Sequence, residues 1–552
     1  MELGSGDAKP LAFIEDPAVP PEHLARFARG VRALLDREGL PAIWYGHASV
    51  GCLHIRPMLD LRAGGAVAQM RRIAEGVADL VVANDGSLSG EHGDGRLRGE
   101  LLPRMYPPDT ITAFATLKRL LDPDGLLNPG VIVDPEPLDE NLRLIASPPL
   151  STHRTTMSFA PEGGLARAAE ACTNNGACRK ADGVMCPSYQ ALGDERHSTR
   201  GRAVLLRAAM EGRLEGGLAN DELHEALDLC LGCKACKSEC PAQVDMARLK
   251  VEALAHRHRE RGVPAMARMF GHTHRLLALG SRAPALARLG AAIVSRRIGR
   301  RVPAPVREWR PVTTRTTGDP VVVMADTFTR FLHPEIGDAA IRVLEATGAA
   351  VTVVNPGCCG RPLLSQGLVG AARKRLTAAL DVLTPPAEAG IPIVTLEPSC
   401  WSMFVDDAVS LTDDPRARVV AGAVVTFERA ILRRGLPVLR ALDDEIVVHT
   451  HCHTRALGEA DGTAALLARV PGLAVTEPDG GCCGMAGGFG YGHPEISRAI
   501  AGMRLLPTVR PGTEAVAAGT SCRHQMDECA GVRPRHPAEV LAAALVPPEA
   551  VH

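Results

Sequence analysis

Four cysteines lie close together in the run CLGCKACKSECP: Cys230, Cys233, Cys236 and Cys240, with Pro241 directly after the last. The spacing C-x2-C-x2-C-x3-C-P is typical of a bacterial ferredoxin site for a [4Fe–4S] cluster. Such short loops let the thiolates and the backbone amides wrap one face of a cubane. A structural zinc site or a group of buried cysteines is the alternative interpretation. The pattern predicts iron–sulfur chemistry.

Three further cysteines precede this run in CTNNGACRKADGVMCPSY: Cys172, Cys178 and Cys186, the last of which stands before a proline. In two-cluster ferredoxins the cysteine before the proline binds the other cluster. This rule predicts one complete [4Fe–4S] site from Cys186, Cys230, Cys233 and Cys236. A second site would hold Cys172, Cys178 and Cys240, three thiolates where four are usual. Three outcomes fit that count: a three-iron cluster, a cluster with a non-cysteine ligand, or an empty site.

Adjacent cysteines followed by glycine occur twice, in NPGCCGRP at 355–362 and in DGGCCGMA at 479–486. A later cysteine, in EPSC and in GTSC, repeats at nearly the same offset, which indicates an internal repeat. The second half offers four thiolates for a cluster or a zinc ion: Cys452, Cys482, Cys483 and Cys522. The first half has Cys358, Cys359 and Cys400, with Asp326 where another cysteine would stand. A metal and a purely structural or vestigial role are both open there.

Two histidines and two glycines lie close together in YGHASVGCLH, which begins at Tyr45 and contains His47 and His54. Histidine is the side chain most often used to bind metals and to move protons near neutral pH. On the residues alone the stretch fits ordinary turn histidines in a core loop, a metal site, or part of a site whose other half lies elsewhere.

The elements that must position these motifs differ along the chain. Residues 1–135 mix strand-like and helical runs, with LAFIED predicted as a strand and PEHLARFARGVRALLDREGL as an amphipathic helix closed by Gly39. A Pro/Ser/Thr-rich linker follows. Residues 160–262 are predicted as a helical cluster domain and residues 263–318 as a helical connector. We interpret its basic end, SRRIGRRVPAPVREWR, as a solvated face or connector and not as a lipid contact.

From residue 319 onward, short apolar segments alternate with helical ones: PVVVMA, AAVTVV, IPIVTLE, EIVVHT, LAVTE and EAVAAG. This alternation predicts α/β folding with largely buried strands. The internal repeat divides the region into two domains, 319–440 and 441–552. The expected fold class is therefore multidomain, α+β and α/β.

Composition narrows the function classes. The 552 residues carry a formal net charge of −1, so no overall charge attracts nucleic acid or an anionic membrane. No apolar run reaches the roughly 18 residues of a spanning helix, and the start of the chain lacks the pattern of a signal peptide. We expect a cytoplasmic protein, with peripheral association at the inner membrane face as an option. Sixteen cysteines in that compartment indicate metal or redox chemistry.

The cysteine blocks and the two CCG repeats together resemble the C-terminal part of the large FAD- and iron–sulfur-containing dehydrogenases of the D-lactate and D-2-hydroxyglutarate type. The CCG halves also resemble cysteine-rich domains of heterodisulfide reductase and glycolate oxidase subunits. Residues 1–135 resemble the end of the FAD-linked oxidase C-terminal domain, since YGHASVGCLH, SGEHGDG at 89–95 and DPDGLLNPG at 122–130 match its landmarks in order.

The resemblance implies roles for particular residues. A divalent metal such as Zn or Mn would be bound by His47, His54 and Glu91, and His92 would be the base beside the flavin. Such a metal binds the oxygens of a 2-hydroxy acid and acidifies its hydroxyl, while a neighbouring histidine takes the proton. This chain departs from the family pattern at Cys52, where relatives have Asn. Arg56 has two interpretations, a partner for the substrate carboxylate and a surface charge.

The family's flavin-binding domain precedes the substrate domain, and no stretch of this sequence has its pattern or a G-x-G-x-x-G unit. We therefore expect FAD to be bound mainly by a missing domain or by a flavin-bearing partner chain, so that the chain is a subunit of a split enzyme or a truncated product. The predicted function is oxidation of a small D-2-hydroxy acid, with electrons passing through [4Fe–4S] clusters to a quinone or a redox protein.

Two other functions fit parts of the sequence. The first is an iron–sulfur electron-transfer subunit of heterodisulfide reductase or glycolate oxidase type without its own substrate chemistry, which leaves GHASVGCLH and SGEHGDG unexplained. The second is a non-catalytic remnant that folds around metal. Counting clusters and assaying D-2-hydroxy acids would distinguish the three.

Overall fold

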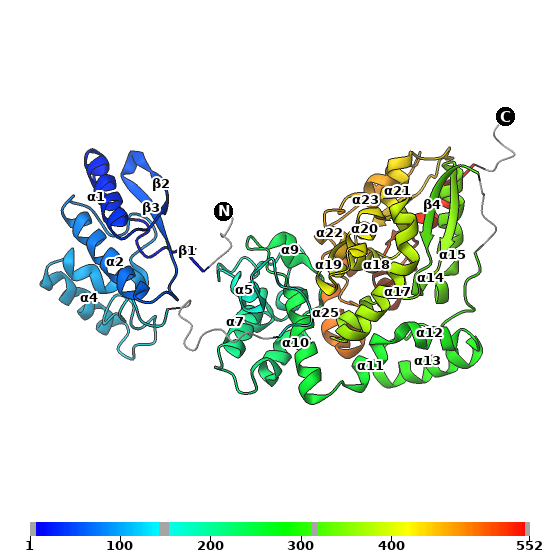
Figure 1. Ribbon diagram of the computed structural model, residues 1–552, viewed down its shortest axis with the longest axis horizontal. Coiled ribbons are helices and arrows are strands. Elements are labelled where there is room, and N and C mark those ends of the chain that lie inside the picture. Colours follow the sequence, from blue (N-terminus) through cyan, green and yellow to red (C-terminus); the bar gives the residue numbers. More distant parts are fainter. Residues whose placement is uncertain (1–6, 143–153, 312–316, 547–552) are drawn as a thin grey trace. The chain divides into compact units, whose positions relative to one another are not determined.

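The computed structural model describes residues 7–142, 154–311 and 317–546. Contacts divide the chain into two compact units, Met1–Leu150 and Ser151–His552 (Figure 1). Both antiparallel and parallel sheets are present, and the predicted multidomain α+β and α/β fold class is confirmed. The finer domain boundaries at 135, 160, 262, 318 and 440 stay predictions.

The first unit is a small antiparallel sheet covered by helices. The strand order is β1–β3–β2, and α1 packs against α2 through apolar side chains spaced three and four residues apart, such as Phe27 and Val31 of α1. Gly39 follows α1 in a left-handed conformation, as predicted for the end of this helix. The elements are β1 (Lys9–Pro10), α1 (Leu24–Arg37), β2 (Ala42–His47), β3 (Cys52–Leu59), α2 (Ala66–Val82), α3 (Gly95–Arg98) and α4 (Pro108–Leu121).

The prediction that LAFIED forms a strand is wrong. Strand β1 ends at Pro10, and the segment continues as a buried turn. Asp16 has φ of +81°, a conformation that a strand residue does not adopt. Phe13 and Ile14 are buried in the core beneath. Their burial explains the apolar pattern, which a strand and a buried turn share.

The first part of the second unit is helical, as predicted for the cluster domain and connector. Buried leucines, methionines and cysteines form one continuous core across the helices of residues 165–261 and the following domain. The helices are α5 (Leu165–Glu170), α6 (Pro187–Leu192), α7 (Thr199–Met210), α8 (Asp221–Asp228), α9 (Ala235–Glu239), α10 (Met246–Arg261), α11 (Ala265–Gly271), α12 (Thr273–Gly280) and α13 (Pro284–Ile298).

Two parallel sheets follow, and they repeat one topology. The first has the order β5–β4–β6–β7 and the second β9–β8–β10, so β4, β5 and β6 correspond to β8, β9 and β10. All six predicted strands are present, and β7 was not predicted. The strands are β4 (Asp319–Met324), β5 (Ala349–Val354), β6 (Ile393–Thr395), β7 (Val424–Thr426), β8 (Glu445–Val448), β9 (Ala474–Thr476) and β10 (Ala515–Val516).

The helices of the two sheet domains connect and cover these strands (Figure 1). In the first domain they are α14 (Thr327–Phe331), α15 (Pro334–Ala346), α16 (Arg361–Ser365), α17 (Val369–Glu388), α18 (Pro398–Ser402), a π-helical turn (Met403–Asp407), α19 (Ala408–Leu411), α20 (Arg416–Ala423) and α21 (Phe427–Arg434). In the second they are α22 (Cys452–Ala456), α23 (Gly462–Leu467), α24 (Phe489–Gly492), α25 (Pro494–Thr508), α26 (Thr520–Ala530) and α27 (Pro537–Ala544).

This topology determines where the repeated cysteines lie. Each CCG motif follows the second strand of its repeat, β5 or β9, and each later cysteine follows the third strand, β6 or β10. Because the strands are parallel, their carboxyl ends meet at one edge of the sheet. The thiols of each half are therefore brought together by loops that leave the same edge.

Candidate metal and iron–sulfur sites

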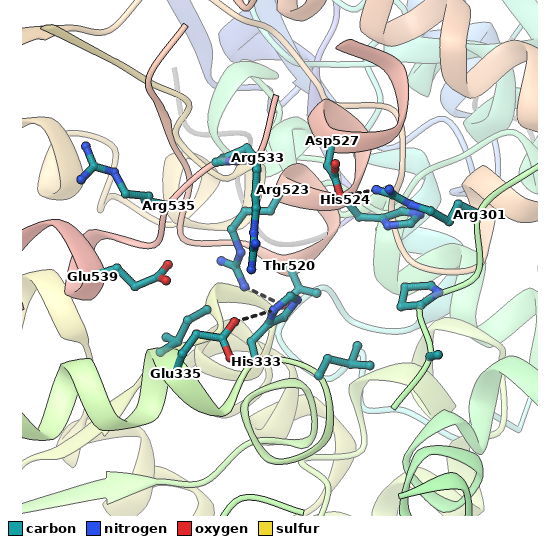
Figure 2. A pocket seen from close by; sticks show the side chains of 15 residues that line it. Arg301, His333, Glu335, Thr520, Arg523, His524, Asp527, Arg533, Arg535 and Glu539 are labelled. Atoms are coloured by element: carbon teal, nitrogen blue, oxygen red, sulfur yellow. Dashed lines mark hydrogen bonds and ion pairs between the residues drawn. The ribbon is translucent and has the colours of Figure 1, made fainter. Parts of the chain in front are cut away.

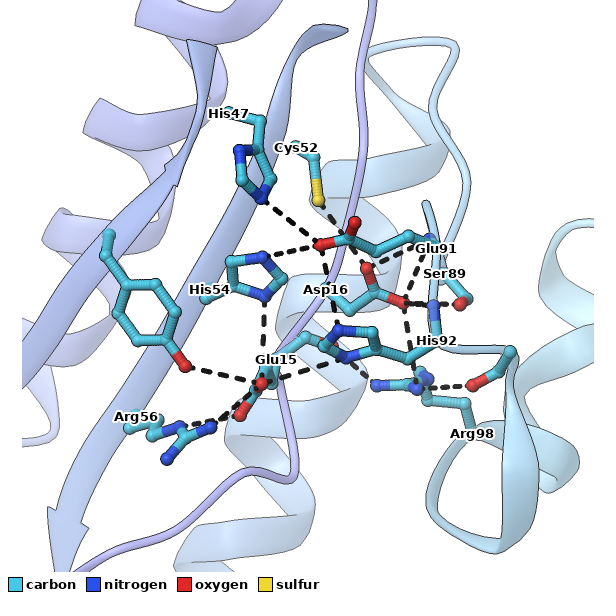
Figure 3. A network of polar contacts seen from close by, with 12 residues as sticks. Glu15, Asp16, His47, Cys52, His54, Arg56, Ser89, Glu91, His92 and Arg98 are labelled. Atoms are coloured by element: carbon cyan, nitrogen blue, oxygen red, sulfur yellow. Dashed lines mark hydrogen bonds and ion pairs between the residues drawn. The ribbon is translucent and has the colours of Figure 1, made fainter. Parts of the chain in front are cut away.

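The hairpin of β2 and β3 in the first unit presents both predicted metal-binding histidines. In its register His47 lies opposite Cys52, and Tyr45 lies opposite His54. The Tyr45 ring stacks on the His54 ring with centroids 4.8 Å apart. Figure 3 shows that Glu91 approaches the two histidines from the loop after α2. The structure thus brings together three residues that the resemblance named.

One oxygen of Glu91 is the centre of this arrangement. Its Oε1 lies 2.8 Å from His54 Nε2, 3.6 Å from His47 Nε2 and 3.7 Å from His92 Nε2. The His54 side chain is 4% exposed, whereas those of His47 and Glu91 are 59% and 44% exposed. Imidazole nitrogens and a carboxylate form a donor set that suits a divalent ion such as Zn or Mn. One of these three side chains is therefore buried and the other two are accessible to solvent.

Sequence reasoning did not identify Glu15, which lies behind the histidines. Its Oε1 is 3.7 Å from His54 Nδ1 and 3.8 Å from His92 Nδ1. His54 Nδ1 is buried and has no hydrogen-bond partner among the described residues. A carboxylate on the far side of an imidazole orients the ring and increases its basicity toward a metal. Glu15 thus lies on the Nδ1 side of the His54 ring, and Glu91 lies on the Nε2 side.

Arg56 binds Glu15, a contact that the sequence did not predict, and its role toward a substrate carboxylate stays a prediction. Its Nε and Nη2 donate to the two oxygens of Glu15 at 2.7 and 3.0 Å. Burial alone would raise the pKa of Glu15, but the hydrogen bond and charge of Arg56 outweigh burial, so the pKa is lowered. The carboxylate therefore stays ionised beneath the histidines.

Asp16, the next residue, fixes the loop that carries Glu91 and His92. It accepts the backbone N–H groups of both residues and the hydroxyl of Ser89. Burial would raise the pKa of Asp16, but these hydrogen bonds outweigh it and lower the pKa. The Cys52 thiol donates to Asp16 Oδ1 at 3.5 Å. Burial and this contact raise the pKa of Cys52 to about 11, so it is a neutral thiol near neutral pH. Sequence reasoning missed Asp16 because the segment was interpreted as a strand.

The second unit contains a cavity lined by the four cysteines predicted for the first cluster, Cys186, Cys230, Cys233 and Cys236. At the start of α7, the backbone N–H of Thr199 donates to Cys186 Sγ at 3.0 Å, and the Thr199 hydroxyl lies 3.1 Å away. Hydrogen bonds to cluster thiolates are a normal part of iron–sulfur sites. Burial raises the pKa values of Cys233 and Cys236 well above the usual value. Without iron to stabilise the thiolates, both stay protonated.

The predicted second set lies in the same hydrophobic core. Cys172, Cys178 and Cys240 are all buried. Cys172 donates to Asn174 Oδ1 at 3.5 Å, and the backbone N–H of Arg200 donates to Cys178 Sγ at 3.3 Å. Whether these three thiols hold a cluster stays a prediction.

The cysteines of the second CCG half form a connected group near the first cavity. Cys482 and Cys522 both hydrogen-bond to Cys483, which holds the pKa of Cys483 well below the usual value. Cys452, at the start of α22, lies close enough to Cys233 that a negative charge on the Cys452 thiolate would raise the pKa of Cys233. His453 lies between the two regions, with Nε2 3.2 Å from the carbonyl of Gly232 and Nδ1 2.9 Å from the Ser402 hydroxyl. His453 therefore joins the domains.

Lys234, between two cysteines of the cavity, was not singled out from the sequence. It has φ of +63° and its side chain is 2% exposed. Its Nζ lies 2.5 Å from Asp406 Oδ2 and 2.7 Å from Asp407 Oδ1, on the π-helical turn after α18. Asp407 also binds Arg361, which follows the first CCG motif, at 2.7 Å. These ion pairs connect the cluster loop to the first CCG domain.

Models of known protein families match successive segments of the chain, and these segments follow the order of the regions seen in the structure. The family model for FAD linked oxidases, C-terminal domain, matches residues 2–132. A 4Fe–4S dicluster domain matches residues 168–244. The cysteine-rich CCG domain matches twice, at 325–405 and 446–527. The chain therefore contains these domains, and the predicted resemblance is confirmed.

Individual relatives agree with this division. The chain is 28% identical to D-2-hydroxyglutarate dehydrogenase of Pseudomonas putida and 26% identical to that of Escherichia coli, in each case over 97% of this chain and 59% of the relative. It thus spans about three fifths of the length of these relatives. It is also 27% identical to the glycolate oxidase iron–sulfur subunit of Escherichia coli, over 68% of this chain and 94% of that subunit.

Proposed function

We propose that this chain, which combines an FAD-linked oxidase C-terminal domain with a 4Fe–4S domain and two CCG domains, belongs to an oxidoreductase that acts on a D-2-hydroxy acid of the D-2-hydroxyglutarate or D-lactate type. Hydride would pass to FAD held mainly by a flavin-bearing domain or partner chain. Electrons would continue through iron–sulfur clusters to a quinone or redox protein. The observation that carries the proposal is the convergence of His47, His54 and His92 on Glu91 in a chain that also has a four-cysteine cavity.

Each residue of the proposed site in the first unit has a separate role in the reaction. His47, His54 and Glu91 would hold a divalent metal, which when bound would polarise the hydroxyl and carboxylate oxygens of the substrate. His92 accepts the hydroxyl proton, since its half-exposed ring lies beside the same carboxylate oxygen. Glu15, 3.8 Å from His92 Nδ1, stabilises the imidazolium that results. Asp16 holds His92 in place through its backbone.

For the second unit we propose an electron path from the first cluster to the second CCG site. Cys186, Cys230, Cys233 and Cys236 would hold a [4Fe–4S] cluster, and Cys172, Cys178 and Cys240 would contribute to a second. Cys452, Cys482, Cys483 and Cys522 would hold the next centre. The proximity of Cys233 to Cys452 and the contact of His453 with Gly232 support this order.

A second candidate is an iron–sulfur electron-transfer subunit without its own substrate chemistry. The similarity to the glycolate oxidase iron–sulfur subunit, over 68% of this chain, favours it. It assigns no role to the His47, His54 and Glu91 group, and we therefore rank it second.

A substrate assay tests the main proposal. The chain, combined with its flavin-bearing domain or partner, is expected to reduce a dye with D-2-hydroxyglutarate or D-lactate and not with the L-enantiomers. A Cys233→Ser variant should still bleach the flavin with substrate but should lose the EPR signal of the reduced cluster and pass electrons to the dye much more slowly. Iron–sulfur signals without reduction by any D-2-hydroxy acid would instead support the electron-transfer subunit.

We further propose that the protein associates peripherally with a membrane surface, in contrast to the solvated face or connector that the sequence predicted for the basic end of residues 263–318. Residues 262–299 contain six arginines, all exposed, and no Asp or Glu. The same helices, α11 to α13, expose large apolar side chains: Met266, Met269, Leu276, Leu279, Leu286, Leu289, Ile293 and Val294. Apolar and cationic groups together are typical of helices that lie in the interface of an anionic bilayer. Among the helices of the described ranges, none is long and apolar enough to cross a membrane.

Liposome binding measures this association. The chain is expected to sediment with vesicles that contain anionic phosphatidylglycerol and much less with neutral phosphatidylcholine. Replacing Leu286 and Leu289, which are 72% and 62% exposed, by serine should release most of the bound protein. The matched control replaces Leu120 and Leu121 of α4, which are 75% and 71% exposed, and should not change binding. Equal binding by both variants would refute the assigned surface.

A further inference from the structure

Arg300 is a buried arginine of the connector, which lies outside both CCG domains in sequence. The residue is 1% exposed, and its guanidinium lies within the second CCG domain. Its Nη2 donates to Gln525 Oε1 at 2.6 Å and contacts Met485 Sδ at 3.1 Å. Its Nη1 donates to the Ser497 hydroxyl of α25 at 3.3 Å. A buried guanidinium is unfavourable unless its donors are satisfied, and here three separate segments satisfy them.

Two of the segments that Arg300 joins carry cysteines of the second CCG site. Met485 comes two residues after Cys483 in the loop of the second CCG motif. Gln525 comes about one turn after Cys522 on α26. The guanidinium therefore holds the loop of one thiol against the helix of the other. The connector thus contributes to the geometry of a cysteine group that contains none of its own residues.

A carboxylate pairs with this buried cation. Glu528 Oε2 lies 3.1 Å from Arg300 Nε, and the Glu528 side chain is 13% exposed. Two further groups face the same carboxylate, His524 with Nε2 at 3.3 Å and Arg498 with Nη2 at 3.9 Å. Glu528 lies within about two helical turns of Cys522 on α26. Because buried charges are screened little, both members of the pair affect the electrostatic potential at the cysteine group.

The first CCG half contains a corresponding ion pair made from different residues. Arg361, directly after the first CCG motif, has Nη1 2.7 Å from Asp407 Oδ2, on the helical segment that follows Cys400. Met485 occupies the position of Arg361 in the second half, and the guanidinium there comes from Arg300 instead. Both halves thus place a guanidinium–carboxylate pair between the CCG loop and the helix after the later cysteine. This recurrence from unrelated parts of the chain supports a role for the charge at the cysteine group.

We propose that Arg300 is a positioning residue of the second CCG site and that its charge raises the reduction potential of the centre held there. The inference rests on the proposed function, in which Cys452, Cys482, Cys483 and Cys522 hold the centre that follows the first cluster. Reduction adds one negative charge to such a centre, and a nearby buried cation stabilises the reduced state. Net charge and hydrogen bonding are known determinants of iron–sulfur potentials. Arg300 would thus favour electron flow from the first cluster toward the second CCG site.

A redox titration monitored by EPR tests the proposal. The signal of the second CCG site is identified as the one that Cys522→Ser removes. Arg300→Met should lower its midpoint potential, since Glu528 is then uncompensated, and Glu528→Gln should raise it. The double variant Arg300→Met/Glu528→Gln leaves no uncompensated buried charge, so it should fold and titrate close to the wild type. Opposite shifts separate the effect of charge from a loosened structure, which both single variants would share.

Arg301 provides the matched control. It pairs with Asp527, beside Glu528 on α26, but the two side chains are 51% and 41% exposed (Figure 2). Water and salt screen exposed charges, so Arg301→Met should leave the potential unchanged. The proposal fails if Arg300→Met and Glu528→Gln shift the potential in the same direction, or if neither shifts it. Those results leave the proposed electron path intact, whereas a wild-type chain without a signal that Cys522→Ser removes would overturn both.

Discussion

Replacing His54 by alanine is expected to lower turnover of the D-2-hydroxy acid by roughly a hundredfold or more. His54 is the buried member of the group around Glu91, with Nε2 2.8 Å from the carboxylate oxygen. A metal acting as a Lewis acid supplies several kcal/mol of transition-state stabilisation, and each ~1.4 kcal/mol corresponds to a factor of ten in rate. Turnover and the metal retained after dialysis should fall together.

Two further variants test the same metal site. Glu15→Gln keeps the shape of the side chain but removes the charge behind His54 Nδ1, and should weaken metal binding by about 10–100-fold. His23→Ala, in the same unit but hydrogen-bonded to the Asn84 carbonyl, should keep normal turnover. If a folded His54→Ala chain turns over substrate at the normal rate, the assignment of the metal site is wrong.

Replacing Lys234 by methionine is expected to lower the free energy of unfolding of the second unit by about 3 kcal/mol, because removal of one member of a buried ion pair leaves the other charges uncompensated. Lys234 pairs with Asp406 and Asp407. Burial alone would raise the pKa of Asp406, but Lys234 and Lys237 lower it to about 2. Thermal unfolding followed by tryptophan fluorescence should show the loss.

The double variant Lys234→Met/Asp406→Asn measures the coupling between the two residues. It should be more stable than Lys234→Met alone, since one uncompensated carboxylate is gone. Lys237→Met is the comparison, because its side chain is 29% exposed and its loss should cost less. A Lys234→Met chain as stable as the wild type would mean that the network contributes nothing to folding.

Motifs with regular spacing were predictable from the sequence. The six apolar strands after residue 319 and the repeat of the CCG halves were correctly placed, because buried parallel strands and duplicated cysteines leave strong local patterns. The four cysteines of the first cavity followed from the ferredoxin rule for the cysteine before proline. His47, His54 and Glu91 came from the resemblance, which named residues that the structure brings together.

Residues that act through tertiary contacts were not predictable. Glu15 and Asp16 lie in an apolar segment that looks like a strand, and only the fold shows them beneath the histidines and the 89–92 loop. Nothing in the local sequence distinguishes Lys234 from other lysines between cysteines. Only the fold shows that Asp406, which is far away in sequence, lies beside it. Such pairings depend on long-range packing that a local pattern does not encode.

The environment of Cys52 determines how readily its thiol reacts with oxidants and alkylating reagents. A thiol with a pKa of about 11 is ionised in about one molecule in ten thousand at pH 7. Because peroxide and alkylating reagents attack the thiolate, such a cysteine resists both. Burial against an ionised carboxylate thus keeps the Cys52 sulfur in its less reactive, protonated form.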